Sequence, residues 1–220
     1  MTHIAVLGAG VVGVTTAWYL QKAGYKVTVI ERESTAAMQT SFANGGQISV
    51  SHATPWATPR APLKALKWLF REDAPLLYRL RADKAQRKWA MQFLQECRAD
   101  RADTNLVQMV NLGLYSRATL QQLRRNIDIE YEQQTRGIMH LYTSQAEFDA
   151  AIAPTERMQE LGCERHFIDI NTAASLEPAL YPIAHKLIGA TYTSRDESGN
   201  AYLFTQRLAE QCAQAGVEFL

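Results

Sequence analysis

The sequence predicts an α/β fold, in which a parallel sheet starts at the N-terminus, is interrupted by an inserted α+β region and resumes at the C-terminus. Three observations predict it. The first 31 residues read as strand, glycine-rich turn, helix and strand. The middle of the chain alternates helical patterns with short apolar runs, and its last twenty residues return to helix, glycine and apolar strand. A strand–helix–strand unit is typical of a parallel sheet.

The N-terminal unit combines residue types that ordinary packing does not require together. Residues 4–7 form a short apolar run of buried-strand character, and Gly8, Gly10 and Gly13 follow it. In this spacing the first glycine permits a tight turn, the second lets the backbone approach a pyrophosphate, and the third lets the helix pack closely on the strand. The helix predicted over residues 11–23 directs its free N–H groups and positive dipole end at that pyrophosphate. The unit therefore predicts a dinucleotide site.

An acidic residue follows the second predicted strand, residues 27–30. Glu31 lies about 20 residues past the glycines, where a carboxylate can accept the ribose hydroxyls of a dinucleotide. The alternative is a glycine-rich turn with a structural use only. That alternative leaves Glu31 unexplained.

The next segment is rich in small and polar residues, where an NAD-binding domain would enter another helix within a few residues. It carries Ser41 and Asn44, which can hydrogen-bond ribityl or phosphate oxygens. It also carries Gly45-Gly46, where the main chain can pass close to a flat ring or a phosphate. Such a loop can wrap the second half of a larger ligand, as FAD requires. The alternative is an ordinary surface loop.

The middle of the chain predicts mixed helices and strands. Helical patterns cover residues 63–70, 84–97, 104–126 and 145–161, and a short helix begins after Asn171 as its cap. Strand patterns cover residues 129–131, 138–142, 167–170 and 187–193. These elements suit a mixed sheet with helices packed on it, as a second domain inserted into the first.

The end of the chain repeats the nucleotide-domain pattern. Residues 201–215 predict a helix, Gly216 ends it, and residues 217–220 start a strand, so we expect the chain to return to the first sheet. A doubly wound FAD domain needs further strands. The sequence is therefore expected to be an N-terminal fragment, about half of a flavoprotein. The alternative is a complete minimal domain with an open, apolar sheet edge.

Several strings along the chain are more particular than the glycine motif. They are Asn44-x-Gly46-Gln47-Ile48-Ser49, Pro55-Trp56-Ala57, Pro62-Leu63-Lys64-Ala65-x-Lys67-Trp68, Glu177-Pro178-Ala179-Leu180 and Asp196-Glu197-x-Gly199. These strings resemble the bacterial D-amino acid dehydrogenases, within the wider family of D-amino acid, glycine and sarcosine oxidases, and the resemblance covers the whole chain. One departure is Val50-Ser51-His52, where members often carry Pro-Gly-Tyr. This segment therefore bears on substrate preference more than on cofactor identity.

The resemblance implies a cofactor, a domain division and a reaction. It implies a Rossmann-like FAD-binding domain over residues 1–60 and 195–220, with an inserted α+β substrate domain over residues 61–194. It implies oxidation of a D-amino acid, for which D-alanine is the first expectation, to an imino acid that water hydrolyses to a 2-oxo acid and ammonia. The residues expected at the FAD are Val6, Leu7, Gly8, Ala9, Gly10, Val11, Val12, Gly13, Glu31, Arg32, Ser41, Asn44, Gly45, Gly46, Gln47 and Ile48.

No catalytic residue is predicted. The resemblance implies a cationic side chain that holds the substrate carboxylate by a bidentate contact, and the family's candidates for it lie beyond Leu220. His52 and Tyr142 are considered as flavin-side or substrate-side residues, but a surface loop and strand packing are their favoured interpretations. The three cysteines and five histidines are scattered without ligand spacing, so no metal site is predicted.

Charge and composition limit the partners. A net charge of +1 argues against bulk attraction to nucleic acid, and the scattered cysteines and a first strand at the N-terminus favour a cytoplasmic protein. Residues 60–88 carry nine Lys and Arg against three acidic residues, with Trp68 and several leucines among them. Such an element can lie on an anionic membrane surface, or it can be a solvated basic face over a buried apolar one.

The resemblance adds an electron acceptor to these partners. It implies a quinone or another respiratory carrier, and with it peripheral attachment to the cytoplasmic face of the inner membrane. Two alternatives stay open. One is a glycine- or sarcosine-type oxidase that reduces oxygen, and the other is a truncated flavoprotein that turns over nothing.

Overall fold

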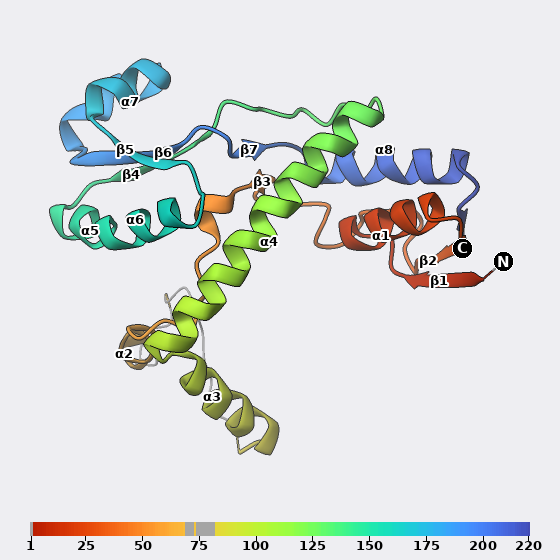
Figure 1. Ribbon diagram of the computed structural model, residues 1–220, viewed down its shortest axis with the longest axis horizontal. Coiled ribbons are helices and arrows are strands. Elements are labelled where there is room, and N and C mark those ends of the chain that lie inside the picture. Colours follow the sequence, from red (N-terminus) through yellow and green to blue (C-terminus); the bar gives the residue numbers. More distant parts are fainter. Residues whose placement is uncertain (1, 69–72, 74–81) are drawn as a thin grey trace.

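The computed structural model describes residues 2–68, 73 and 82–220. Strands in this part of the chain form three small sheets, with orders β1-β2-β8, β3-β7 and β4-β6-β5. The first and last of these sheets lie at opposite ends of the molecule, and the long helix α4 (Ala99–Asn126) runs between them (Figure 1). The small β3-β7 pair lies at the middle, beside α4.

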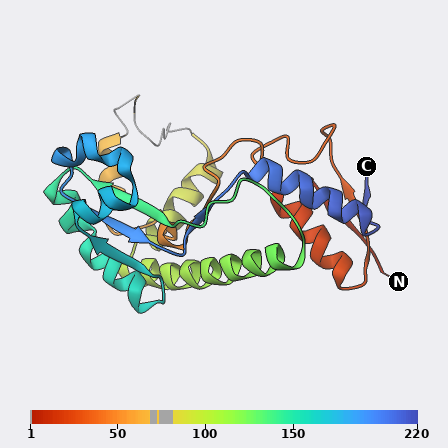
Figure 2. The same ribbon diagram turned by 90° about the horizontal axis from the view of Figure 1, so that it is seen from above.

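The first sheet is parallel, with β2 (Lys26–Ile30) between β1 (His3–Leu7) and β8 (Glu218–Phe219). Its helices α1 (Val11–Lys22) and α8 (Ala201–Gln214) lie side by side (Figure 2). Helix α1 precedes β2, and α8 precedes β8, which is parallel to β2, so the N-termini of both helices face the carboxyl edge of the sheet. The predicted parallel sheet and the return of the chain to it are confirmed.

The core of this region is apolar and continuous. It joins side chains of the two helices to the central strand. Fully or almost fully buried members are Val14, Ala17, Val27, Val29, Leu208 and Cys212. This packing fixes α1 against the sheet and thereby holds the turn between β1 and α1, which carries the glycine motif.

Three helices lead out of the first region. Helix α2 (Ala61–Trp68) and helix α3 (Lys84–Glu96) stand near the N-terminal end of α4 (Figure 1). Asp83 caps α3 by accepting the N–H of Ala85 at 2.8 Å. The last two residues of the predicted helix 63–70 lie outside the described residues. Helix α4 starts five residues before the predicted Thr104, because its first turn is polar and carries no apolar signal.

The third sheet is antiparallel, with β6 (Gly189–Thr193) between β4 (Ile138–Tyr142) and β5 (Arg165–Ile168). The helices α5 (Gln145–Ala150) and α6 (Ile152–Glu160) pack on one face of it. The helix α7 (Ile170–Leu176) and the 3₁₀ helix η2 (Pro178–Lys186) pack on the other. A mixed region of helices and strands in the middle of the chain is thus present.

Beyond shifted strand bounds, since β5 lies two residues before the predicted 167–170 and β6 begins two residues after the predicted 187, three predicted details of this region are wrong. Residues 129–131 form no strand; Tyr131 is buried by packing against Phe204, with ring centroids 5.2 Å apart, rather than by ladder pairing. The predicted helix 145–161 is two helices, because Pro154 has no N–H for the carbonyl of Ala150 and its ring would clash with it. The short helix is capped by Asp169 and not by Asn171.

A short antiparallel pair that the sequence did not predict joins the two ends of the molecule. It consists of β3 (Gln47–Ile48) and β7 (Glu197–Ser198), and the 3₁₀ helix η1 (Val50–His52) follows β3 directly. Each strand has two residues, too few for a hydrophobic alternation to be visible in sequence. Among the described helices, none has the length and apolarity needed to cross a bilayer.

Candidate functional site

The glycine turn between β1 and α1 has the backbone that its spacing predicts. Gly8 takes a left-handed conformation (φ +94°), which a residue with a Cβ adopts at a cost. A Cβ on Gly13 would lie 1.9 Å from the carbonyl oxygen of Gly8. Only glycine at this position lets α1 begin directly against the turn, so the N-terminus of the helix is open at the carboxyl edge of the sheet.

The Glu31 carboxylate lies against this turn. It accepts the N–H of Ala9 at 2.5 Å through Oε2, and the N–H groups of Arg32 and Glu33 at 2.9 and 3.1 Å through Oε1. These bonds, the Ala9 bond first, lower the pKa of Glu31. The acid therefore stays ionised and oriented beside the glycines. Arg32 is exposed and forms an ion pair with Glu33 at 3.3 Å.

The N-terminus of α1 also contacts the segment of small and polar residues 40–49, here called the polar loop. The Val11 N–H donates to Ser41 Oγ at 3.0 Å, and Ser41 is buried. Gly10 lies close to the same hydroxyl, since a Cβ on Gly10 would be 3.4 Å from Ser41 Oγ. Two predicted cofactor residues of this neighbourhood, Leu7 and Val12, are 80% and 75% exposed. Apolar side chains this exposed suit contact with a ligand rather than with a core.

The rest of the polar loop folds back on itself. Asn44 Oδ1 accepts the Gly46 N–H at 2.7 Å, and Asn44 Nδ2 donates to the Thr40 carbonyl at 3.3 Å. Gly46 has a φ of +57°, and a Cβ there would lie 2.2 Å from the Gly199 carbonyl oxygen. The Gly199 N–H in turn donates to the Gly46 carbonyl at 2.7 Å. Glycine is thus needed at position 46 for the two backbones to approach, whereas a Cβ on Gly199 would lie 2.5 Å from the Tyr131 ring.

A hollow of about 440 Å³ opens beside this contact. It is lined by loop residues 41–46, by Glu132 and by residues 198–201 at the N-terminus of α8. The predicted residues Ser41, Asn44, Gly45 and Gly46 all lie in this lining. The sequence did not predict the contribution of residues 198–201, which come from the far end of the chain.

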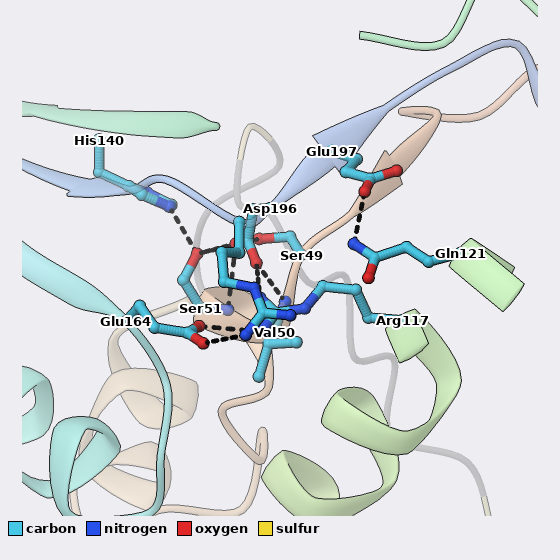
Figure 3. A network of polar contacts seen from close by, with 10 residues as sticks. Ser49, Val50, Ser51, Arg117, Gln121, His140, Glu164, Asp196 and Glu197 are labelled. Carbon is cyan, nitrogen blue, oxygen red and sulfur yellow. Dashed lines mark hydrogen bonds and ion pairs between the residues drawn. The ribbon is translucent and has the colours of Figure 1, made fainter. Parts of the chain in front are cut away.

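The segment after β3 is held by a buried carboxylate (Figure 3). Asp196, at 0% exposure, lies in the turn between β6 and β7. Its Oδ1 accepts the Val50 N–H at 3.0 Å, and its Oδ2 accepts the Ser51 N–H at 3.2 Å, the Ser51 hydroxyl at 2.7 Å and the Ser49 hydroxyl at 2.8 Å. Arg117 of α4 donates to Oδ1 at 3.3 Å.

Two arginines of α4 anchor the acidic pair Asp196-Glu197. Arg117 is 3% exposed and also donates to Glu164 at 2.9 Å. Glu197 is buried and accepts from Arg124 at 2.6 and 3.2 Å and from Gln121 at 2.6 Å. Burial acts to raise the pKa of Glu197, but the bonds from Arg124 and Gln121 outweigh it, and the pKa is lowered. Both acidic groups are therefore compensated from the same helix.

Ser51 is the point where this segment meets the third sheet. Arg165 of β5 donates through Nη1 to the Ser51 carbonyl at 3.2 Å and through Nη2 to the Tyr142 hydroxyl at 2.8 Å. The Ser51 hydroxyl lies 3.5 Å from Nε2 of His140, whose ring lies 4.4 Å from that of the exposed His52. The structure places both His52 and Tyr142 in this cluster, although neither was predicted as a site residue.

His140 is a neutral member of the cluster. Burial first, then the charges of His52 and Arg165, lower its pKa to about 4, against the opposing effect of Asp196. The ring therefore accepts or donates a hydrogen bond as a neutral imidazole at ordinary pH.

The residues that form this hydrogen-bond network were not predicted as site residues from the sequence. Asp196 and Glu197 entered only as part of a family-like string, and Arg117 was not singled out. A signal was present, since Arg117, Gln121 and Arg124 follow one another at helical spacing on one side of α4. The solvent-exposed face of an amphipathic helix shows the same spacing, so this signal does not by itself identify buried acidic partners.

The surface around α2 and α3 exposes large apolar side chains beside basic ones. Trp56 is 87% exposed, and Trp89 is also exposed. They line a groove of about 770 Å³ together with residues of α3 and α4. Described basic residues nearby in sequence are Arg60, Lys64, Lys67, Lys84, Arg87 and Lys88. Other members of the predicted basic stretch, Leu69, Phe70, Arg71, Glu72, Arg79 and Arg81, lie outside the described residues.

Comparison with known proteins places these features in a family. The family model described as FAD dependent oxidoreductase matches residues 3–220. The D-amino acid dehydrogenase of Dechloromonas aromatica is 50% identical over 99% of this chain and 52% of its own length. That of Paramagnetospirillum magneticum is 48% identical over 98% and 51%. The chain spans about half the length of the curated relatives it matches.

Solved structures show the same fold. The glycine oxidase from Geobacillus kaustophilus superposes with a TM-score of 0.65 at 19% identity, over all of this chain and 47% of its own. The FAD-bound L-alpha-glycerophosphate oxidase from Mycoplasma pneumoniae superposes with a TM-score of 0.64 at 16% identity, over all of this chain and 45% of its own. At these identities the likeness shows the fold alone.

Proposed function

Because the chain belongs to the family of FAD-dependent oxidoreductases, we propose that it serves the oxidative deamination of D-amino acids to 2-oxo acids and ammonia. One observation carries the cofactor part of this proposal. The glycine turn, the open N-terminus of α1 and the ionised Glu31 meet at the carboxyl edge of a parallel sheet, with the polar loop beside them. The names of the relatives at 42–50% identity support a D-amino acid as substrate.

The residues at this edge fit FAD. The turn from Gly8 to Gly13 and the first N–H groups of α1 would hold the pyrophosphate, because a Cβ on either glycine is disfavoured and the helix dipole is positive there. Glu31 would accept the ribose hydroxyls. Ser41 and Asn44 would face the ribityl chain, with Gly45 to Ile48 passing close to the ring. Arg32 would lie at the rim of the adenosine part.

The chemistry divides between the cofactor and the chain. When bound, FAD supplies an acceptor for the hydrogen and the two electrons that leave the α-carbon of the amino acid. The chain would orient this acceptor through Glu31 and the polar loop. We assign residues 1–60 and 195–220 to the FAD-binding domain and residues 61–194 to the substrate domain.

The proposed electron acceptor is a quinone or another carrier rather than oxygen. The relatives at 42–50% identity are named dehydrogenases, which supports this choice. The alternative is a glycine- or sarcosine-type oxidase. The two differ in one product, since an oxidase releases hydrogen peroxide from a D-amino acid or glycine without an added acceptor. A peroxide assay with a dye acceptor present or absent separates them.

The exposed apolar and basic surface around α2 and α3 supports peripheral contact with a membrane. Trp56, Leu63 and Leu66 are exposed beside Lys64 and Lys67, a pattern that suits an anionic lipid surface. This contact would bring the protein to the cytoplasmic face of the inner membrane. We expect the protein to float with vesicles of anionic lipid at low salt and not with neutral ones. Equal flotation with both kinds of vesicle would mean that the basic residues do not contribute to membrane binding.

An absorbance scan tests the proposed function directly. The protein is incubated with FAD, desalted and scanned, and D-alanine is then added with a dye acceptor. A retained flavin band that D-alanine bleaches supports the proposal. Retained flavin without bleaching supports an FAD-binding chain without this activity. No retained flavin, even in a chain extended past Leu220, contradicts the proposal.

A pair of variants tests the assignment of Glu31. Glu31→Ala removes the carboxylate beside the turn, and the expected loss of FAD affinity is about tenfold, which is ~1.4 kcal/mol. Glu156→Ala is the matched control, because Glu156 is an exposed residue of the same type on α6, at the other end of the molecule from the turn (Figure 1). Equal affinities of the two variants, measured by titration of flavin fluorescence, would remove Glu31 from the site.

A further inference from the structure

The buried acidic pair Asp196-Glu197 is not used by the proposed chemistry, yet it is the most extensively bonded polar group in the described chain. We propose that Asp196 is a positioning residue for the cofactor. Anchored by Arg117, it holds the 49–51 turn and thereby fixes the residues before it, 44–48, against which the flavin part of FAD lies. The inference rests on the proposed FAD site.

The bonds of Asp196 are concentrated on one short segment. Of the five contacts to its carboxylate, four come from Ser49, Val50 and Ser51, and the fifth comes from Arg117 (Figure 3). Burying a carboxylate is costly unless charge and hydrogen bonds compensate it. The turn supplies the hydrogen bonds, so the turn cannot move without leaving a buried acid unsatisfied.

These bonds continue a pairing that is too short to hold by itself. Residues 46–48 pair with residues 197–199 through the two-residue ladder β3-β7 and the Gly199–Gly46 bond. A ladder of this length has little stability of its own. Asp196 extends the pairing by three residues, because its side chain takes the place of a strand partner for residues 49–51. The result is one continuous contact between residues 46–51 and 196–199.

The other side of this contact is a rigid helix. Arg117 holds Asp196, and Arg124 with Gln121 holds Glu197, all from α4. Val50 packs against α4 as well, since a Cβ on Gly113 would lie 3.6 Å from its side chain. Residues 49–51, at the end of the polar loop, are therefore fixed against α4, which belongs to the proposed substrate domain.

The network also connects the loop to the third sheet. All three polar groups of Ser51 are bonded: its N–H to Asp196, its carbonyl to Arg165, and its hydroxyl to Asp196 with His140 at 3.5 Å. Asp196 thus sets the position of the loop relative to β4 and β5. A change at Asp196 is expected to alter how a bound flavin is oriented as well as how tightly it is held.

The test compares Asp196→Asn with the matched control Asp103→Asn, in FAD-reconstituted protein. Asparagine keeps the size of the side chain but replaces one acceptor by a donor, which faces the N–H groups of the turn. Asp103 is exposed and pairs with Arg157 at the surface, so the same substitution there touches no loop. We expect Asp196→Asn to weaken FAD binding by about tenfold or more and the control to leave it unchanged.

Two readouts separate positioning from loss of overall stability. Hydrogen exchange should quicken at residues 46–51 in Asp196→Asn while β1, β2 and α1 keep their protection. The visible circular dichroism of the retained flavin reports ring orientation and should change in the same variant. If Asp196→Asn does not fold, Ser51→Ala removes a single hydroxyl and should show both effects at smaller size.

The outcomes are distinct from those of the proposed function. If the unsubstituted protein retains no flavin, even in a chain extended past Leu220, the proposed function fails, and this role of Asp196 fails with it. If the unsubstituted protein retains flavin, and folded variants at Asp196 or Ser51 match it in affinity and visible dichroism, the positioning role alone is overturned.

Discussion

The two segments predicted to hold the cofactor are built in opposite ways. The glycine turn at α1 is held by neighbours within the first strand–helix–strand unit: Gly13 packs against the Gly8 carbonyl, and Glu31 accepts the Ala9 N–H. The 46–51 segment is held by residues more than a hundred positions away, Asp196 and Gly199. One segment is a local backbone motif, and the other is a long-range contact between distant parts of the chain.

This difference teaches which changes each segment should tolerate. The glycine turn depends on backbone conformations that its own residues and their sequence neighbours determine. Distant substitutions should therefore leave the turn intact. The 46–51 segment depends on buried charges from α4 and the β6–β7 turn, so it should respond to substitutions far from it in sequence. Three substitutions or conditions test this contrast.

The largest effect is expected from Arg117→Met. Methionine keeps the apolar stem but leaves Asp196 buried without its guanidinium partner, and breaking a buried ion pair in this way costs about 3–5 kcal/mol. Urea unfolding followed by circular dichroism measures the loss. Arg157→Met is the matched control, since Arg157 pairs with Asp103 and Glu160 at the surface, where such pairs contribute about 0–1 kcal/mol. Similar losses in both variants would contradict the buried network.

A smaller effect is expected from Gly46→Ala. The added Cβ would lie 2.2 Å from the Gly199 carbonyl at a residue with φ of +57°, so the two backbones must separate, at a cost of about 1–3 kcal/mol. Gly45→Ala, one residue earlier, meets no atom within 4 Å and should change stability by less than ~0.5 kcal/mol. Equal thermal stability of the two variants would mean that the contact with Gly199 is not required.

A further effect is a pH dependence that involves the long-range segment. The folded-state pKa of His140, about 4, lies below its ordinary value of 6.5, so between these values the unfolded chain binds a proton that the folded chain does not. Stability should therefore fall as the pH is lowered from 6.5 to 4. His140→Gln should flatten this part of the profile. Unfolding midpoints of the unsubstituted protein and of His140→Gln, measured across this pH range, test the expectation. Parallel profiles would contradict the burial of a neutral His140.

Much of the first region could be predicted from sequence, because its signals are local. The glycine spacing, the two strands and the position of Glu31 all lie within 31 residues, and each has a direct backbone or side-chain reason. The return of the chain to the first sheet was also predictable, since helix, glycine and apolar strand recur in that order. One error fell where local pattern and tertiary packing disagree, at Tyr131, which is buried without belonging to a strand.

The sequence by itself determined the parallel nucleotide-binding unit, since backbone conformation at Gly8 and Gly13 and the apolar runs beside them depend on adjacent residues. Only the tertiary structure decided how the polar loop is held. Asp196, Arg117 and Ser51 are 66 or more positions apart from one another, and nothing in the residues next to each of them shows that they meet. The physical reason is burial: a carboxylate removed from water must find its donors, and only the packed chain settles which distant groups these are.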